Sequence, residues 1–450
     1  MAGKKVVDMT TGSPARHILN FAIPTLLGFL FQQFYNLMDT VIIGRLLGTT
    51  DMAAVGSTGA INFLVLGFCI GLCNGMGIPV AQSFGAKDYS ALRKYVANAI
   101  WVGASFAVII TTFVAINCKN ILIFMNTPTD ILESANAYIF IIFLGIPIVI
   151  LYNLCASIIR SLGDSRTPVY FLVLSSVLNI GLDLVLIRPL GIAGPALATV
   201  VSQTISGTLC LIYIIRKFDI LHLSKEELPF KQRYALRLIS MGLPMGLQYS
   251  ITAIGSVVLQ TAVNGLGSIV VASMTAGQRI SMFFCCPFDA LGSTAATFTG
   301  QNMGARRADR IHRGMWTANF IGFAYSIFAF FILFFFGSRL SLLFMDTPDP
   351  VVMANVGLFL KCNVSIYMAL AAVNIVRFTI QGMGYSALAI LSGVFEMIAR
   401  AGVGFLLVPR YGFKAACFAN PSAWVLADIF LFIAFYVLLG KIKRRFATES

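Results

Sequence analysis

Charged residues are scarce in this sequence. Asp, Glu, Lys and Arg make up 11% of its 450 residues, whereas hydrophobic residues make up 58%. Soluble domains carry about 25% charged residues, so charge this sparse cannot cover a soluble globule of this size. The sequence therefore predicts an integral membrane protein. Apolar stretches of about 20 residues recur, as helical spans require, in place of the ~10-residue alternation of a membrane β-barrel.

Several patterns that catalysis or cofactor binding would need are missing. Three histidines and nine cysteines form neither a zinc pattern nor a spaced disulfide framework. No Walker A loop is present, so this chain is not expected to hydrolyse ATP. No nucleophile accompanies a general base in a catalytic arrangement. The sequence predicts that the protein is not an enzyme and that it uses no cofactor and no bound metal.

Twelve apolar segments predict an all-α protein with twelve transmembrane helices. Proline and glycine recur inside them, where they mark kinks and close packing rather than helix ends. The expected spans are approximately 17–43, 52–80, 95–117, 131–157, 168–187, 192–215, 235–263, 269–299, 314–337, 354–376, 386–408 and 413–440.

Lysine and arginine predict the orientation. With the N-terminus in the cytoplasm, most of them fall on cytoplasmic segments, including Lys4, Lys5 and Arg377 and the basic stretch 216–237. The outer loops hold only Arg45, Lys119, Arg188, Arg339, Arg410 and Lys414. By the positive-inside rule, both termini are cytoplasmic. The net charge of +14 is then a topology signal, and no nucleic-acid partner is expected.

Three stretches repeat at an offset of 219 or 220 residues. "VAQSFGAKDYSALRKYVANA" from Val80 resembles "TGQNMGARRADRIHRGMWTA" from Thr299, and "LIFMNTP" from Leu122 resembles "LLFMDTP" from Leu342. "FAIPTLLG" and "MGLPMGLQ" align Pro24 with Pro244. Because six spans are an even number, both halves enter the membrane in the same direction, which makes the repeat parallel. The predicted parts are an N-terminal lobe (1–215), a cytoplasmic linker (216–234) and a C-terminal lobe (235–450), an arrangement typical of transporters.

Five acidic residues fall within the predicted spans: Asp39, Asp183, Asp289, Glu396 and Asp428. Each costs about 2.5–3.5 kcal/mol at a helix centre, so each needs a partner, water or a proton. Polar residues at helical spacing accompany the first two acids, and neighbouring spans add more. These companions are Gln32, Tyr35 and Asn36 near Asp39, Ser176 and Asn179 near Asp183, and Asn153, Thr199 and Gln203.

Two interpretations of Asp39 and Asp183 remain open at this point. Both lie in the outer half of the membrane in the first bundle, where they could form a protonatable or cation-binding site. Alternatively, each lies at the interface and pairs with a nearby arginine, Arg45 or Arg188.

The acids of the second half are less regular. Glu396 and Arg400 are one helical turn apart and predict a pair that neutralises itself. Asp289 and Asp428 stand alone, and either could line the second bundle, near Arg279 or Lys361.

These motifs resemble the multidrug and toxic compound extrusion (MATE) family. The resemblance lies in "QQFYNLMDTVIIGRLLG" with the following "MAAVGSTGAINFLVLGFCIGLCNGMGIPVAQSFGAKD", in "IIRSLGDSRTP", "LNIGLDLVLI" and "LGIAGPALATV", and in "GQNMGA" and "GMGYS" of the second half. It implies two six-helix lobes around a V-shaped cleft and a monomer in the plasma (inner) membrane. It also implies export of small organic, often cationic, compounds, driven by inward flow of protons or sodium ions, with membrane lipids as surroundings.

The resemblance also implies site residues. Prokaryotic members carry a first-lobe site with an Asp in helix one and an Asp in helix five, which match Asp39 and Asp183, and Gln32, Asn153 and Asn179 match its polar companions. Members with a second-lobe sodium site carry acids in helices seven and ten, but segments 235–263 and 354–376 contain no Asp or Glu. Coupling through the first lobe is therefore expected, with protons favoured over sodium. A lipid or lipid-linked precursor flippase of the wider superfamily is the alternative function.

Overall fold

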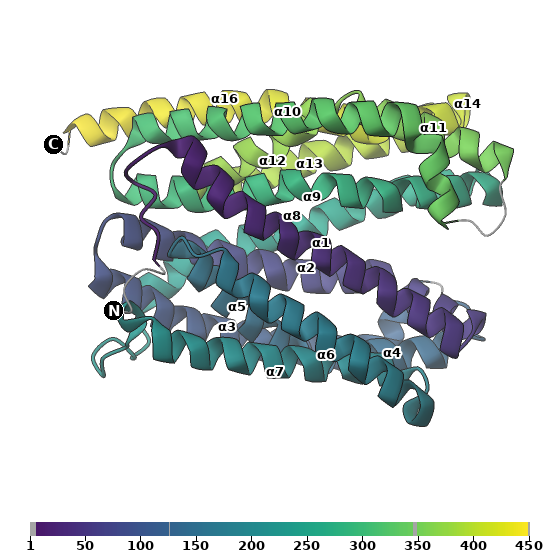
Figure 1. Ribbon diagram of the computed structural model, residues 1–450, viewed down its shortest axis with the longest axis horizontal. Coiled ribbons are helices and arrows are strands. Elements are labelled where there is room, and N and C mark those ends of the chain that lie inside the picture. Colours follow the sequence, from purple (N-terminus) through teal and green to yellow (C-terminus); the bar gives the residue numbers. More distant parts are fainter. Residues whose placement is uncertain (1–5, 126, 345–348, 449–450) are drawn as a thin grey trace. The chain divides into compact units, whose positions relative to one another are not determined.

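The structure, a computed structural model, describes residues 6–125, 127–344 and 349–448, and every regular element in them is helical (Figure 1). Ten helices are long and apolar enough to cross a membrane. Two bent pairs raise the number of candidate spans to as many as twelve: α4 with α5, bent by 45°, and α11 with α12, bent by 51°. The predicted all-α membrane fold is confirmed. Lys4, Lys5 and most of the second "LLFMDTP" copy lie outside the described residues.

The chain divides into two compact units. Unit 1 comprises residues 1–8 and 27–247, and unit 2 comprises residues 9–26 and 248–450. Two of the three boundaries fall inside helices, in α1 (Pro14–Leu46) and α8 (Gln232–Asn264), a few residues after Pro24 and Pro244. A proline inside a helix removes a backbone hydrogen bond and is a common cause of kinks. The repeat therefore places a proline near the point where each of these helices passes from one unit to the other.

Unit 1 is a bundle of long helices. Besides its parts of α1 and α8, it contains α2 (Thr49–Gly85), α3 (Tyr89–Phe124), α4 (Leu132–Leu144), α5 (Ile146–Ser161), α6 (Arg166–Leu190), α7 (Ala193–Lys217) and the short η1 (Asp219–Leu221). Small residues let α2 and α5 pack closely. A Cβ added at Gly77 would lie 2.3 Å from Ser157 Oγ, and Ser161 Oγ donates to the Gly77 carbonyl at 2.8 Å. This contact anchors α5, and α5 packs in turn against α7.

Unit 2 has the same plan with more interruptions. It contains α9 (Ser268–Gly304), α10 (Ala308–Leu340), η2 (Ser341–Phe344), α11 (Pro350–Val364), α12 (Tyr367–Gly382), α13 (Ser386–Gly402), the π-helical turn η3 (Val403–Leu407), α14 (Val408–Tyr411), α15 (Phe413–Cys417) and α16 (Ala419–Thr448). α16 packs against α13 and α12 and also runs alongside α10 (Figure 1). Edge-to-face ring contacts join Phe288 to Tyr325 and Tyr367, and Tyr367 to Trp424. These rings fill the interior between α9, α10, α12 and α16.

The segment between α7 and α8 is held against α3. Arg93 Nε donates to Glu227 Oε2 at 2.8 Å, Asn98 Oδ1 accepts from the Lys231 amide at 2.8 Å, and Trp101 Nε1 donates to the Leu228 carbonyl at 3.0 Å. The hydrogen bond from the Arg93 guanidinium lowers the pKa of Glu227 to about 2. The linker predicted from the basic stretch is therefore an ordered loop of unit 1.

One residue of the predicted topology is misplaced. The sequence places Arg377 in a cytoplasmic segment, between the expected spans 354–376 and 386–408. In the structure Arg377 lies inside α12, is 6% exposed, and forms an ion pair with Glu396 of α13. The expected loop position is wrong, because α12 continues past Arg377 to Gly382. The carboxylate that pairs with Arg377 is 19 residues away in sequence, so local spacing does not reveal it.

Candidate functional site

Unit 1 brings the two predicted carboxylates together. Asp39 lies on α1 and Asp183 on α6, and their carboxyl groups are close enough to interact with each other. Asp183 is fully buried, whereas Asp39 is half-buried. Two carboxylates this close cannot both be ionised without strong repulsion, so a proton or a cation between them stabilises the pair.

A chain of hydrogen bonds leads to Asp183 from α1 and α7. The Tyr35 hydroxyl lies 3.2 Å from Thr199 Oγ1. With the Asn179 amide oriented as its neighbours require, its oxygen accepts from Thr199 Oγ1 at 3.1 Å and its nitrogen donates to Asp183 Oδ2 at 3.2 Å. In this orientation, donors point from Tyr35 through Thr199 and Asn179 toward Asp183. The chain fixes one oxygen of Asp183 as an acceptor.

The other oxygen of each carboxylate is left unbonded. Asp39 Oδ1 and Asp183 Oδ1 are buried atoms without a hydrogen-bond partner within the described residues. A buried polar atom without a partner costs about 1–3 kcal/mol. These two oxygens are therefore the natural positions for a proton or a monovalent cation. Among the same residues, Arg45 and Arg188 form no ion pair with either carboxylate, which disfavours the interpretation based on those arginines.

The remaining predicted residues of this unit contribute less. Ser176 Oγ donates to the Leu172 carbonyl and Asn153 Nδ2 to the Val149 carbonyl, so both side chains bond to their own helices. Asn36 is exposed on α1, and Gln32 and Gln203 are half-buried. The structure thus brings Tyr35, Asn179 and Thr199 to the carboxylate pair, and it shows no contact of the other five with that pair.

Tyr138 is a further residue beside the carboxylate pair, and nothing in the sequence singles it out. This tyrosine lies on α4, is 6% exposed, and interacts electrostatically with Asp39, Tyr35 and Asp183. It stands in the apolar stretch "AYIFIIF", where it resembles a core aromatic. Its position beside the pair could be found only from the packing of α4.

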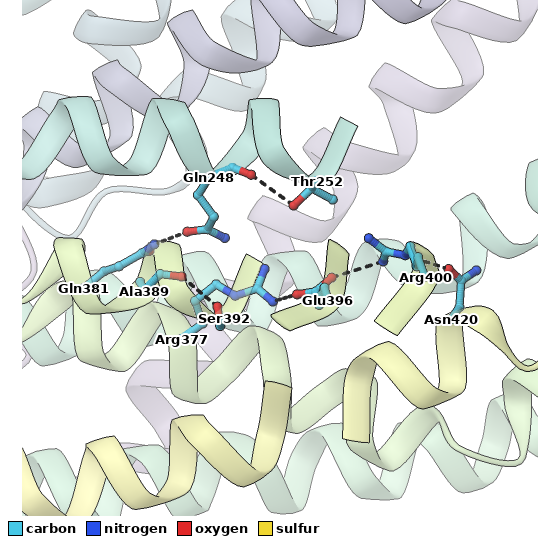
Figure 2. Close-up of polar contacts among 9 residues, drawn as sticks. All are labelled: Gln248, Thr252, Arg377, Gln381, Ala389, Ser392, Glu396, Arg400 and Asn420. Atoms are coloured by element: carbon cyan, nitrogen blue, oxygen red, sulfur yellow. Dashed lines mark hydrogen bonds and ion pairs between the residues drawn. The ribbon is translucent and has the colours of Figure 1, made fainter. Parts of the chain in front are cut away.

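Unit 2 contains a separate buried ion-pair network (Figure 2). Glu396 of α13 accepts from Arg377 at Oε1, and it accepts from Arg400 at Oε2 over 3.1 Å. Arg400 Nε also donates to Asn420 Oδ1 at 3.1 Å. The pair of Glu396 and Arg400 expected from helical spacing forms, and Arg377 joins it as a second arginine on the same carboxylate.

Asp289 and Asp428 lie near this network. Asp289 of α9 and Asp428 of α16 both interact with Arg377. The sequence suggested Arg279 or Lys361 as the neighbouring cation, but the charged partner that the structure gives Asp289 is Arg377, and Lys361 lies over the ring of Phe334. The two isolated acids of the second half therefore belong to one electrostatic cluster.

The chain matches known transporters over most of its length. The MatE family model matches residues 24–185 and 244–406, once in each half of the chain. The probable multidrug resistance protein YpnP of Bacillus subtilis (strain 168) is 30% identical over 352 residues, which cover 77% of this chain and 78% of that protein. The multidrug export protein MepA of Staphylococcus saprophyticus is 25% identical, over 63% of this chain and 63% of that protein.

A solved structure gives the same fold. A crystal structure of a MATE protein in complex with MaL6 superposes with a TM-score of 0.92 at 21% identity, covering 98% of this chain and 100% of that one. The two family matches begin at positions 220 residues apart, which is the offset of the internal repeat. On these grounds, this chain belongs to the MatE family, whose members are multidrug and toxic compound extrusion transporters and not enzymes.

Proposed function

We propose that this protein is a secondary antiporter that exports small organic, often cationic, compounds in exchange for protons that bind at Asp39 and Asp183. The observation that carries the proposal is the carboxylate pair in unit 1, with one unbonded buried oxygen on each residue. An intramembrane acid without a counter-charge is expensive, and it is a functional-site candidate for that reason. The multidrug names of the similar proteins support organic compounds as the substrates.

Protonation provides the coupling in this proposal. With one proton between Asp39 and Asp183, the pair carries a single negative charge, and with two it is neutral and tolerates a dry, apolar environment. When protons leave, the charged pair requires water around it, whereas the neutral pair is stable in a dry environment. The protonation state of the pair therefore determines which of these two environments is favoured. A transporter that alternates between two orientations of its repeated halves can use this difference to link proton release to the opening of one side.

The direction of exchange follows from the expected topology. With both termini in the cytoplasm of a plasma-membrane protein, α1 enters from the inner side and Asp39 lies toward its outer end. Protons would then bind from the outside and leave toward the cytoplasm. The protein is proposed to act as a monomer among membrane lipids.

The test is transport of a fluorescent organic cation into proteoliposomes under separately imposed pH and sodium gradients. Wild-type protein should respond to the pH gradient, and the double variant Asp39→Asn/Asp183→Asn should lose drug-driven proton movement. Asp130→Asn is the matched control, because Asp130 is an exposed acid of the same unit, in the loop that precedes α4. Unchanged exchange in the double variant would reject the site. Dependence on sodium alone would replace the proton with sodium, and lipid translocation without drug transport would favour the flippase.

A further inference from the structure

The buried ion pairs of unit 2 carry an excess of positive charge. Two guanidinium groups, Arg377 and Arg400, bind the single carboxylate of Glu396. All three residues are between 3% and 6% exposed. A net charge in such an interior is unfavourable, so the triad requires one further negative charge nearby.

Asp428 is placed to supply that charge. It lies on α16, which packs against both α12 and α13, and it interacts with Arg377 and Glu396. Asp428 Oδ1 and Arg377 Nε are both buried atoms without a hydrogen-bond partner within the described residues. An acceptor and a donor are thus left open on neighbouring helices, and together they can form a second ion pair for Arg377.

The acids of the cluster outnumber its arginines. Asp289 of α9 also interacts with Arg377, so two guanidinium groups face three carboxyl groups. Of the charged residues on the described helices packed against α16, Arg377 and Glu396 are those that interact with Asp428. The cluster is neutral when one carboxyl group is protonated, and it carries one negative charge when none is.

The positions of the acids suggest which one holds the proton. Asp289 is an exposed residue of α9 and does not need a proton to satisfy a buried oxygen. Glu396 already accepts from an arginine on each oxygen, so neither oxygen is open to a proton. Asp428 Oδ1, by contrast, is buried and has no hydrogen-bond partner within the described residues. A proton is also the cation that fits best, because two guanidinium groups repel a metal ion, whereas a proton needs only one carboxyl oxygen.

We infer that unit 2 contains a second proton-binding site at Asp428. While Asp428 is protonated, Arg377 pairs with Glu396 alone. Once the proton leaves, Arg377 pairs with the carboxylates of both Glu396 and Asp428. This site uses α12, α13 and α16 of unit 2, whereas Asp39 and Asp183 belong to unit 1. Its contribution to transport rests on the antiport function proposed above, but proton binding at Asp428 does not.

The first experiment measures proton binding directly. Infrared difference spectra of purified protein between acidic and alkaline buffer should show a protonated-carboxyl band that persists in Asp39→Asn/Asp183→Asn and disappears in Asp428→Asn. Asp428→Glu should keep a titrating band at a shifted frequency, which separates loss of the group from loss of folding. Asp309→Asn is the matched control in the same unit, because Asp309 is an exposed acid paired with Lys443 at 2.7 Å.

Two results would contradict a proton-binding site at Asp428. In the first, Asp428→Asn leaves the spectra unchanged. In the second, the band responds to sodium at constant pH and does not respond to pH. Either outcome is independent of whether the protein transports any drug. If wild-type protein exchanges no organic cation but the Asp428 band titrates, the antiport proposal fails and this inference stands.

The second experiment counts protons. In proteoliposomes with the membrane potential clamped at zero, each coupled proton multiplies the sustained substrate gradient about tenfold per unit of imposed pH difference. Asp428→Asn should lower the sustained gradient about tenfold without abolishing transport, whereas Asp309→Asn should leave it unchanged. A gradient unaffected by Asp428→Asn would overturn the coupling role of the second site.

Discussion

Thr199 is the residue on which the polar chain of unit 1 depends. Its hydroxyl lies between Tyr35 of α1 and Asn179 of α6, at 3.2 and 3.1 Å. A hydroxyl can accept one hydrogen bond and donate another, so it can orient the Asn179 amide while it receives the Tyr35 proton. The Thr199 backbone amide also donates to the Asn179 oxygen at 3.1 Å, so the hydroxyl is one of two Thr199 groups that turn the amide nitrogen toward Asp183.

Replacing Thr199 by valine should therefore lower the rate of proton-driven transport. Valine keeps the shape and removes the hydroxyl, and losing one such hydrogen bond costs about 1 kcal/mol, or roughly fivefold in rate. Initial rates of cation uptake under a fixed pH gradient measure the effect. Thr204→Val is the matched control on the same helix, because the Thr204 hydroxyl bonds to the Val200 carbonyl of its own helix. Equal rates in the two variants would show that the chain has no role in coupling.

At the scale of elements, the packing of helices determines which side chains meet, and the spacing of residues within one helix does not show this. The acid pair could be predicted because polar residues lie at helical spacing from Asp39 and from Asp183, each within its own apolar segment. This spacing can be read from the sequence alone. Tyr138 and Arg377 could not be predicted in this way. One resembles a core aromatic and the other resembles a loop charge, and each acquires its role from a helix that is distant in sequence.

Helix α3 and the loop that precedes α8 form another such contact. The Arg93 guanidinium holds the pKa of Glu227 at about 2, below its ordinary value of 4.5. A carboxyl group whose pKa is lowered by folding stabilises the folded state fully when the pH is above the pKa of the unfolded state. This contribution is lost as the pH falls from about 4.5 to about 2. At neutral pH the loop is therefore held in place by the ionised form.

Glu227→Gln should loosen this loop at neutral pH. Hydrogen exchange of residues 218–231 should accelerate severalfold, because the neutral amide bonds more weakly to Arg93 than the carboxylate does. Glu226→Gln is the matched control, since Glu226 is an exposed acid of the same loop. Acidification of the wild-type protein toward pH 2 should reproduce the effect after correction for intrinsic exchange rates. Protection that is identical in both variants would contradict a stabilising role for the ion pair.

At the scale of the whole molecule, the repeat was the most informative part of the sequence. One offset aligned Pro24 with Pro244, and the family model matches both halves at the same offset. The two copies nevertheless differ in their acids. The carboxylate pair of unit 1 has no equivalent on the repeat-related helices of unit 2, where Glu396 is already committed to two arginines. A repeat predicts the fold of both halves, but the side chains that bind ions diverge between them.

Inward proton flow through Asp39 requires that the outer end of α1 face the outside, so the orientation of the chain is the last prediction. The positive-inside rule places the segment around Ser224 in the cytoplasm and the loop around Asp130 outside. A cysteine introduced as Asp130→Cys should react with a membrane-impermeant maleimide in intact cells, and one introduced as Ser224→Cys should react only after the cells are opened. Native cysteines provide a low background, because seven of the nine are buried. The opposite labelling pattern would reverse the direction of exchange and place Asp39 toward the cytoplasm, which the proposed mechanism does not allow.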